Sequence, residues 1–450
     1  MVSFYVYDIA FMILFMLGIA FLLVKNKKRV TREGVMFMFR TKWGEKSMKR
    51  FDDKHHKLLG NLRYVIIAVG FVLMILMMMM LIQSAWVYVS QPEISEIIKA
   101  PPIAPLIPYF PELFGMESLF PPFYFAYFLI AITIVGLVHE FSHGIFMRYS
   151  KTKIKSTGIV FLGPIPGAFV EQDDDSFQKK SRVNQMSVLG AGVFANLLTA
   201  ILFYLLYMGF FAMSFSASGY VFSSYSGNLI NVSNYEINQI GNNLVLSNGE
   251  LEYFLDVNIL AQLGNSEIVY AYDNTPAFQN RLTGVINGID DVKISDQSDL
   301  AEALSRYKPN DKVVVSTQTD SFNIVLGEHP ENESRAYLGV VNFGNSQTGM
   351  KKFLATLMGF RDSSTYYETR WNSDFVEFIY HLLWWIMIIN ILVALFNMLP
   401  WGILDGGRFL TLGIGKFTSE KVAKGISKFV GRFILMLFAL MMAFWVIRLF

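Results

Sequence analysis

Residues 123–147 read FYFAYFLIAITIVGLVHEFSHGIFM, an apolar run of the length that crosses a bilayer as a helix. Near its end stand His139, Glu140 and His143, whose side chains are costly to bury in a membrane. Ionisable groups are kept in membrane helices where they have a partner or a function. The run therefore predicts a transmembrane helix that carries a functional site.

The composition of the whole chain favours a polytopic α-helical membrane protein. Of 450 residues, 53% are hydrophobic and 16% are charged, whereas about a quarter of a soluble domain is charged. The first apolar run lacks both a preceding basic segment and a cleavage site, so we interpret it as a retained helix. The net charge of +2 gives no reason to expect nucleic acid as a partner. We expect about six transmembrane helices, at Val6–Val24, Tyr64–Val89, Phe123–Met147, Val188–Met213, Phe378–Leu399 and Phe429–Ile447.

Basic residues in the connecting loops predict the orientation, because short cytoplasmic loops are enriched in lysine and arginine. The loop after the first run is rich in them from Lys25 to Arg50, while the loop after the second has only Lys99. The loops after the third and fifth runs are basic again. We expect a multi-pass protein of the cell membrane with both termini extracytoplasmic and the HEFSH segment toward the cytoplasm.

The stretch from residue 214 to about residue 370 has another composition, rich in Ser, Asn and Asp with alternating apolar residues. In the predicted topology it is an extracytoplasmic domain inserted between the fourth and fifth helices. Lys312–Ser316 and Phe322–Leu326 are expected to be strands, and Asp299–Tyr307 a short amphipathic helix.

His139 and His143 are four residues apart, so on a helix their rings project from one face. This H-E-x-x-H spacing is typical of zinc sites in which two imidazoles bind the metal and the glutamate, here Glu140, is a general base. The chain has no cysteine, so histidine and carboxylate side chains must hold any metal. A polar cluster that joins helices is the alternative, but the membrane setting favours a Zn²⁺ site.

A catalytic zinc ion needs one more protein ligand. The acidic segment Glu171–Asp175 is one candidate, although a solvated cytoplasmic loop explains it better. Asp405 is the other, within NMLPWGILDGGRF (397–409), where Pro400 and the Gly406–Gly407 pair are expected to break the helix. The topology returns this segment to the cytoplasmic side near the depth of His143, so we favour Asp405.

These motifs resemble those of the site-2 protease family of intramembrane zinc metalloproteases. The matching segments are HEFSH (139–143), GAGVFAN (190–196) and NMLPWGILDGG (397–407). The resemblance implies that Asp405 of the L-D-G motif is the third zinc ligand, and it associates Asn196, Asn397 and Pro400 with the site and with substrate binding. Val193 departs from the family pattern, since many members have proline there.

Members of this family often carry an extracytoplasmic PDZ domain, and residues 275–341 resemble one. This segment contains PAFQNRL, GVINGIDDVKI, DLAEAL and a closing YLGVV, but lacks the usual G-D before the I-N-G-like turn. The resemblance implies that the domain contacts substrate or a regulatory peptide.

A substrate helix hides its carbonyls in internal hydrogen bonds and must be unwound before water can attack. Ile154–Leu162 and Ala168–Val170 are expected to form a membrane-associated β-hairpin around the turn at residues 163–167. Its edge could accept the unwound substrate as an added strand, and Asn397 could bond to freed backbone groups. A plain cytoplasmic hairpin is the alternative.

The expected organisation has four parts: a two-helix region with a basic loop (1–100), the first half of a protease core (101–213), the extracytoplasmic domain (214–370) and the second half of the core (371–450). The predicted function is cleavage of transmembrane protein substrates within the lipid bilayer, near its cytoplasmic face. Two alternatives remain. One is a metalloprotease of another clan, such as the CAAX prenyl protease type, with glutamate as third ligand; the other is a non-proteolytic scaffold or metal-handling protein.

Overall fold

The computed structural model describes residues 4–27, 29–90, 101–102, 106–117, 120–163, 165–240, 243–249, 252–256, 268–343 and 360–447. The chain separates into two compact units. The first comprises Met1–Phe210 with Glu377–Phe450, and the second comprises Phe211–Val376.

Six helices among the described residues are long and apolar enough to cross a membrane. Each contains most of one predicted run, which confirms a multi-span helical membrane protein. They are α1 (Phe4–Lys25), α2 (Glu45–Ser90), α5 (Phe125–Tyr149), α7 (Arg182–Ser214), α11 (Ser373–Asn397) and α13 (Glu420–Ile447). Shorter helices are α4 (Phe110–Leu113), α6 (Asp174–Gln178) and α12 (Asp405–Ile414).

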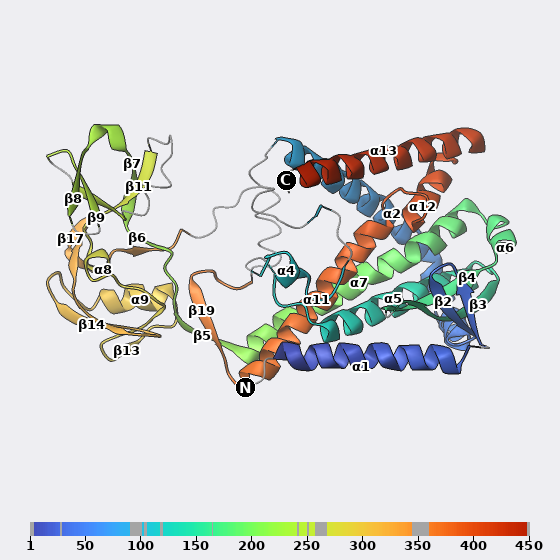
Figure 1. Ribbon diagram of the computed structural model, residues 1–450, viewed down its shortest axis with the longest axis horizontal. Helices are drawn as coiled ribbons and strands as arrows, with labels where there is room; N and C mark the ends of the chain where they lie inside the picture. Colours follow the sequence, from blue (N-terminus) through green and yellow to red (C-terminus); the bar gives the residue numbers. More distant parts are fainter. Residues whose placement is uncertain are drawn as a thin grey trace. The chain divides into compact units, whose positions relative to one another are not determined.

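Helix α2 begins well before the predicted apolar run, at Glu45, and is kinked at His55. It packs against both α5 and α13, while α1 packs on α5. Figure 1 shows α1 lying alongside α5, and α2 running obliquely to them. At one end of α2 the Glu45 carboxylate accepts a hydrogen bond of 2.6 Å from Arg148, in the last turn of α5. Helix α5 is thereby held between the two N-terminal helices.

Asp8 of α1 fixes the other end of α5. Its buried carboxylate accepts hydrogen bonds from the backbone N–H groups of Phe125 (2.6 Å) and Ala126 (3.0 Å). The Tyr109 hydroxyl donates to the same carboxylate at 2.7 Å. The first N–H groups of a helix have no partner within it, so Asp8 supplies the cap from a neighbouring helix.

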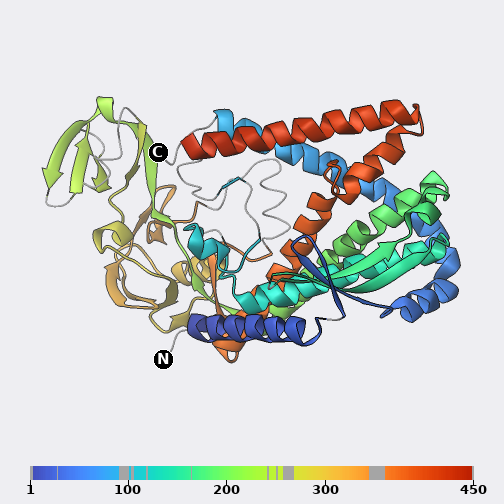
Figure 2. The ribbon, with the colours of Figure 1, turned by 45° about the vertical axis from the view of Figure 1, so that its right-hand side comes forward.

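A four-stranded antiparallel sheet of the first unit joins two segments that are far apart in sequence. Its order is β1 (Val30–Glu33), β2 (Met36–Thr41), β3 (Ile154–Leu162) and β4 (Ile165–Gln172). The predicted hairpin is present as β3 and β4, but the predicted turn at residues 163–167 is too long. Ile165–Gly167 already pair with Val160–Leu162, and the pairing continues to Gln172. Strands β1 and β2 were not predicted. Strand β4 is at the edge of the sheet and packs against α5, as Figure 2 shows.

The second unit is built mainly from antiparallel β-structure. Its largest sheet has the order β15-β14-β12-β5-β19, with β13 paired to β12. The buried core of this part includes Tyr220, Ile286 and Val315, and Leu300 of α9 packs into it. The predicted strands and helix near residues 299–326 are confirmed. The bounds are β5 (Phe215–Tyr220), β12 (Ile286–Ile289), β13 (Val292–Lys293), α9 (Gln297–Leu304), β14 (Lys312–Thr317), β15 (Ser321–Val325) and β19 (Thr365–Thr369).

A second sheet of this unit has the order β7-β11-β10-β9-β8 and its own core around Leu246 and Leu255. Two small antiparallel pairs are also present: β16 and β17 form a hairpin, and β18 pairs with β6, which is far from it in sequence. The bounds are β6 (Ser224–Tyr225), β7 (Gly227–Asn231), a 3₁₀ turn (Val232–Asn234), β8 (Glu236–Ile240), β9 (Asn243–Ser247), β10 (Glu252–Asp256), β11 (Ile268–Tyr272), α8 (Pro276–Gln279), β16 (Gly327–His329), β17 (Asn332–Tyr337) and β18 (Val340–Val341).

Candidate active site

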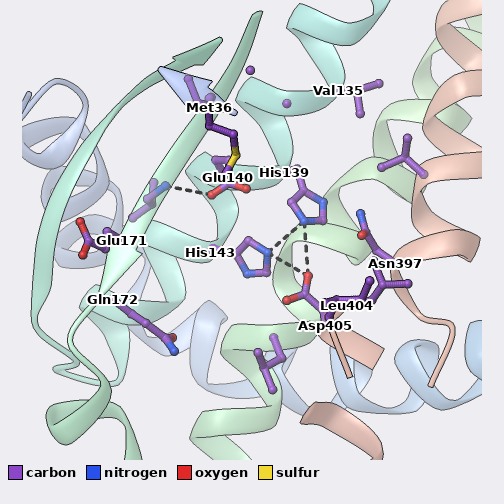
Figure 3. A pocket seen from close by; sticks show the side chains of 18 of the residues that line it. Met36, Val135, His139, Glu140, His143, Glu171, Gln172, Asn397, Leu404 and Asp405 are labelled. Carbon is purple, nitrogen blue, oxygen red and sulfur yellow. Dashed lines mark hydrogen bonds and ion pairs between the residues drawn. The ribbon is translucent and has the colours of Figure 1, made fainter. Parts of the chain in front are cut away.

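The two histidines of the HEFSH segment face each other on α5. Their Nε2 atoms are 3.0 Å apart, and both side chains are buried. Asp405, the first residue of α12, brings its Oδ2 atom to 3.4 Å from His139 Nε2 and 3.3 Å from His143 Nε2. Figure 3 shows the three side chains converging. The structure therefore brings together the three predicted ligands.

This donor set fits a zinc ion. One ligand atom from each of His139, His143 and Asp405 lies within 4.8 Å of the other two, which is close enough for one ion to reach all three. Two imidazoles and one carboxylate are a donor set of catalytic zinc sites, which keep a further position open for water or substrate.

The remaining ring nitrogens are held by α7. His143 Nδ1 lies 2.7 Å from the Val188 carbonyl oxygen, which can only accept, so Nδ1 carries the proton and Nε2 is left free. His139 Nδ1 lies 3.1 Å from the side-chain nitrogen Nδ2 of Asn196, whose oxygen is buried and has no partner among the described residues. Exchanging the two ends of this amide places the oxygen against an Nδ1–H of His139 and gives it that partner. Both imidazoles then present Nε2 to a metal.

Asn196 is fully buried behind His139. The family resemblance associates it with substrate binding, and its contact is with a histidine ring.

Gly192 of α7 lies directly against both histidine rings. A Cβ atom there would come within 2.6 Å of His143 Nε2 and 2.7 Å of His139 Cε1. Gly192 belongs to the segment GAGVFAN, whose small residues could also be explained by close packing between helices. The structure shows that the space left at Gly192 is filled by the two imidazoles.

The segment that carries Asp405 folds back tightly on itself. Helix α11 ends at Asn397, before Pro400, as expected for a residue that disfavours helix in front of it. The Gly406–Gly407 pair, however, does not break a helix: both residues lie in the first turn of α12. A side chain at either would collide with backbone carbonyl groups between Met398 and Trp401. These glycines therefore allow α12 to start against the preceding turn, where Pro400 is buried.

Glu140 lines the same cavity, of about 730 Å³, as the three candidate ligands. Its Oε2 atom accepts a hydrogen bond of 2.9 Å from the backbone N–H of Val170 in β4. Asn397 and the residues of β4 from Ile165 to Ala168 also line this cavity. The carboxylate is thus fixed between the histidines and the edge strand of the sheet, as Figure 3 shows.

The acidic segment Glu171–Asp175 has partners of its own. The Ser156 hydroxyl, 2.7 Å away, and the Arg40 guanidinium hold the pKa of the Glu171 carboxyl below its ordinary value. Asp173 accepts a hydrogen bond from the Ser176 backbone and caps α6. Asp174 pairs with Arg408 at 3.7 Å. These contacts agree with Asp405, and not this segment, as the carboxylate beside the histidines.

Comparison with known proteins places the chain in a family. Residues 127–440 match the family described as Peptidase family M50. The uncharacterized protein MJ0971 of Methanocaldococcus jannaschii is 41% identical over 71 residues, which are 16% of this chain and 19% of that protein. The match to that relative thus spans about a fifth of its length. The family match, by contrast, includes both the HEFSH helix and the L-D-G segment, and the chain belongs to peptidase family M50, the site-2 protease family of membrane zinc metalloproteases.

Proposed function

We propose that this protein is an intramembrane zinc endopeptidase that cleaves transmembrane segments of other membrane proteins near the cytoplasmic face. The observation that carries the proposal is the convergence of His139, His143 and Asp405 beside Glu140. Because the histidines belong to a helix that can span the bilayer, the site suits a peptide bond that lies in the membrane itself.

The chain's own residues have defined tasks in this reaction. His139, His143 and Asp405 would hold the ion, and Val188 would keep His143 in the tautomer that leaves Nε2 free. With its amide oxygen turned toward Nδ1–H, Asn196 would do the same for His139. Bound zinc supplies a Lewis acid that activates water and polarises the scissile carbonyl. Glu140 takes the proton of the attacking water and delivers it to the leaving amine nitrogen.

We further propose that the edge of β4 binds the unwound substrate. This strand has β3 on one side only, and its residues line the cavity beside Glu140. An extended peptide can add to such an edge through backbone hydrogen bonds. Pro166 lacks an N–H group and is tolerated at an edge strand. Asn397, which lines the cavity near Asp405, is placed to bond to backbone groups freed by unwinding, and Pro400 shapes the turn between them.

The orientation and the domain boundaries are part of this proposal. We propose extracytoplasmic termini and a site toward the cytoplasm, supported by the basic loops that follow α1, α5 and α11. We keep the division into 1–100, 101–213, 214–370 and 371–450; the separation of the chain near Phe210 and Glu377 supports its two later boundaries, while residues 1–100 belong to the same compact unit as the core. Residues 275–341 are proposed to be a PDZ-like module that contacts substrate or a regulatory peptide. Its support is the compact arrangement of α9 with β12, β14 and β15 around one core.

The test compares wild-type protein with Glu140→Gln after reconstitution into lipid vesicles with a panel of single-span substrates. Both proteins are expected to contain zinc, while cleavage by the variant falls by at least about 10²-fold, the contribution of a general base. Equal cleavage by both would refute the role of Glu140. Zinc binding with every substrate left intact by the wild type would favour a metal-handling or scaffold protein instead.

A further inference from the structure

We propose that α2, which precedes the part of the chain matched by the peptidase family, positions the third zinc ligand, Asp405, by packing against Phe409. The inference rests on the proposed zinc site at His139, His143 and Asp405. It assigns a task to an N-terminal helix for which the motifs of the sequence give none.

Phe409 is the link between α2 and the ligand. It follows Asp405 by four residues, so the two side chains lie on the same face of α12, one turn apart. The Phe409 side chain is fully buried. Its ring packs edge-on against that of Phe71 in α2, with ring centroids 5.0 Å apart.

Two glycines from different helices form a slot for the tip of this ring. A Cβ atom at Gly70 of α2 would lie 2.8 Å from Phe409 Cζ, nearer than any ordinary contact. A Cβ atom at Gly190 of α7 would lie 3.5 Å from Phe409 Cε2. The ring therefore reaches the backbone of α2 because residue 70 has no side chain.

Helix α2 packs against residues on both sides of Asp405 in the chain. Gly70 also faces the Met398 methyl group, 3.2 Å from a Cβ atom built there, and Met398 precedes the turn that leads to Asp405. One turn earlier, Ile66 of α2 packs into the space left by Gly190. Helix α2 thus contacts Met398 and Phe409, which lie before and after Asp405 in the chain. It also contacts α7, which carries the groups that bind the histidine Nδ1 atoms.

Small displacements are enough to matter at this place. Raising the 2.8 Å separation to the 3.4 Å at which ordinary contacts begin requires a shift of about 0.6 Å. Metal–ligand distances are held within about 0.2 Å of their preferred values. Because α12 has only ten residues and starts at the ligand, a shift at Phe409 is transmitted to Asp405.

The test uses the full-length protein in detergent and the variant Gly70→Val, with Gly70→Ala as a milder change should the first fail to fold. We measure zinc affinity by competition with a chelator, the visible absorption spectrum of the Co²⁺-loaded protein, and the unfolding temperature. Gly70→Val is expected to weaken zinc binding by about tenfold or more and to change the cobalt spectrum. Adding Phe409→Leu, whose smaller side chain makes room for the valine, should restore the zinc affinity and the cobalt spectrum.

Phe128→Ala is the matched control for a purely structural role. Phe128 is buried on α5, in a cluster with Phe123 and Trp385 that includes no described residue from Met398 to Phe409. This variant is expected to lower the unfolding temperature and leave zinc affinity and the cobalt spectrum unchanged. Wild-type-like zinc binding and spectrum in Gly70→Ala or Gly70→Val would overturn the inference, as would an equal loss of affinity in Phe128→Ala. Absence of zinc binding in the wild type would instead refute the proposed function.

Discussion

Replacing Gly192 by alanine is expected to weaken zinc binding although it changes no ligand. The added Cβ atom would lie 2.6 Å from His143 Nε2 and 2.7 and 2.8 Å from His139 Cε1 and Cδ2. Since ordinary contacts begin at 3.4 Å, these atoms must separate by about 0.6 to 0.8 Å. The rings cannot simply retreat, because Val188 and Asn196 hold their Nδ1 atoms.

The size of the effect follows from this constraint. Loss of the contacts that orient a metal-binding histidine costs about 10- to 100-fold in affinity, or about 1.4 to 2.7 kcal/mol. Both histidines are displaced by one methyl group, so we expect the upper end of this range for Gly192→Ala.

Chelator competition on the purified protein measures the change directly. Gly209→Ala is the matched control, because Gly209 lies on the same helix and a Cβ atom there has no neighbour within 4 Å among the described residues. The control is expected to bind zinc as the wild type does. A Gly192→Ala variant with wild-type affinity would refute the reasoning, since it would show that the rings adjust without cost.

Three further predictions concern the ligand and two helix caps. Asp405→Ala is expected to reduce the zinc content to that of chelator-treated protein and to abolish cleavage; zinc retained at the wild-type level would exclude Asp405 as a ligand. Asp8→Leu leaves the first N–H groups of α5 without their acceptor and should destabilise the protein by about 2 kcal/mol, whereas Asp8→Asn keeps an acceptor and should lose less in denaturant unfolding. Asp296→Ala removes the N-cap of α9 and should cost about 1 kcal/mol. Hydrogen bonds from the Ser298 hydroxyl and from backbone N–H groups lower the pKa of the Asp296 carboxyl. The stabilisation by the cap is therefore present above the ordinary carboxyl pKa, and it is lost as the pH falls through the lowered pKa of Asp296. The difference in unfolding temperature between the wild type and Asp296→Ala should therefore shrink at low pH, and a constant difference would contradict it.

The six helices and the pairing of the two histidines could be predicted because their signals are local. Apolar runs of membrane length and the four-residue spacing of His139 and His143 are read directly from the sequence. Asp405 followed from topology, since the loop charges return it to the side of His143.

The four-stranded sheet could be predicted only in part. Its strands β1 and β2 lie in the basic loop after the first apolar run, and Met36–Phe39 is a short run of apolar residues without the alternation that indicates a strand. The pairing of Met36 with Leu162 joins segments far apart in sequence, and no local pattern reports such a partner. The five-stranded sheet of the second unit was missed for the same reason, because β11 pairs with β7 across an intervening set of strands.

The packing role of α2 could not be predicted because the whole helix segment is apolar. Gly70 lies in a run that is apolar on all sides, and a helix face that touches protein is as apolar as one that touches lipid. Periodicity therefore could not show that Ile66 and Gly70 face the site while Val65 and Val72 are exposed.

The strands that open and close the second unit, β5 and β19, are direct neighbours, with Tyr220 opposite Thr365. The chain therefore leaves β5 and returns in β19 at adjacent positions. If the residues between Tyr220 and Thr365 were replaced by a two-residue turn, the two strands would form a hairpin. Such an insertion behaves as an exchangeable cassette. Because its two ends are adjacent, the segment between them can change in length or sequence while β5 and β19 keep their pairing.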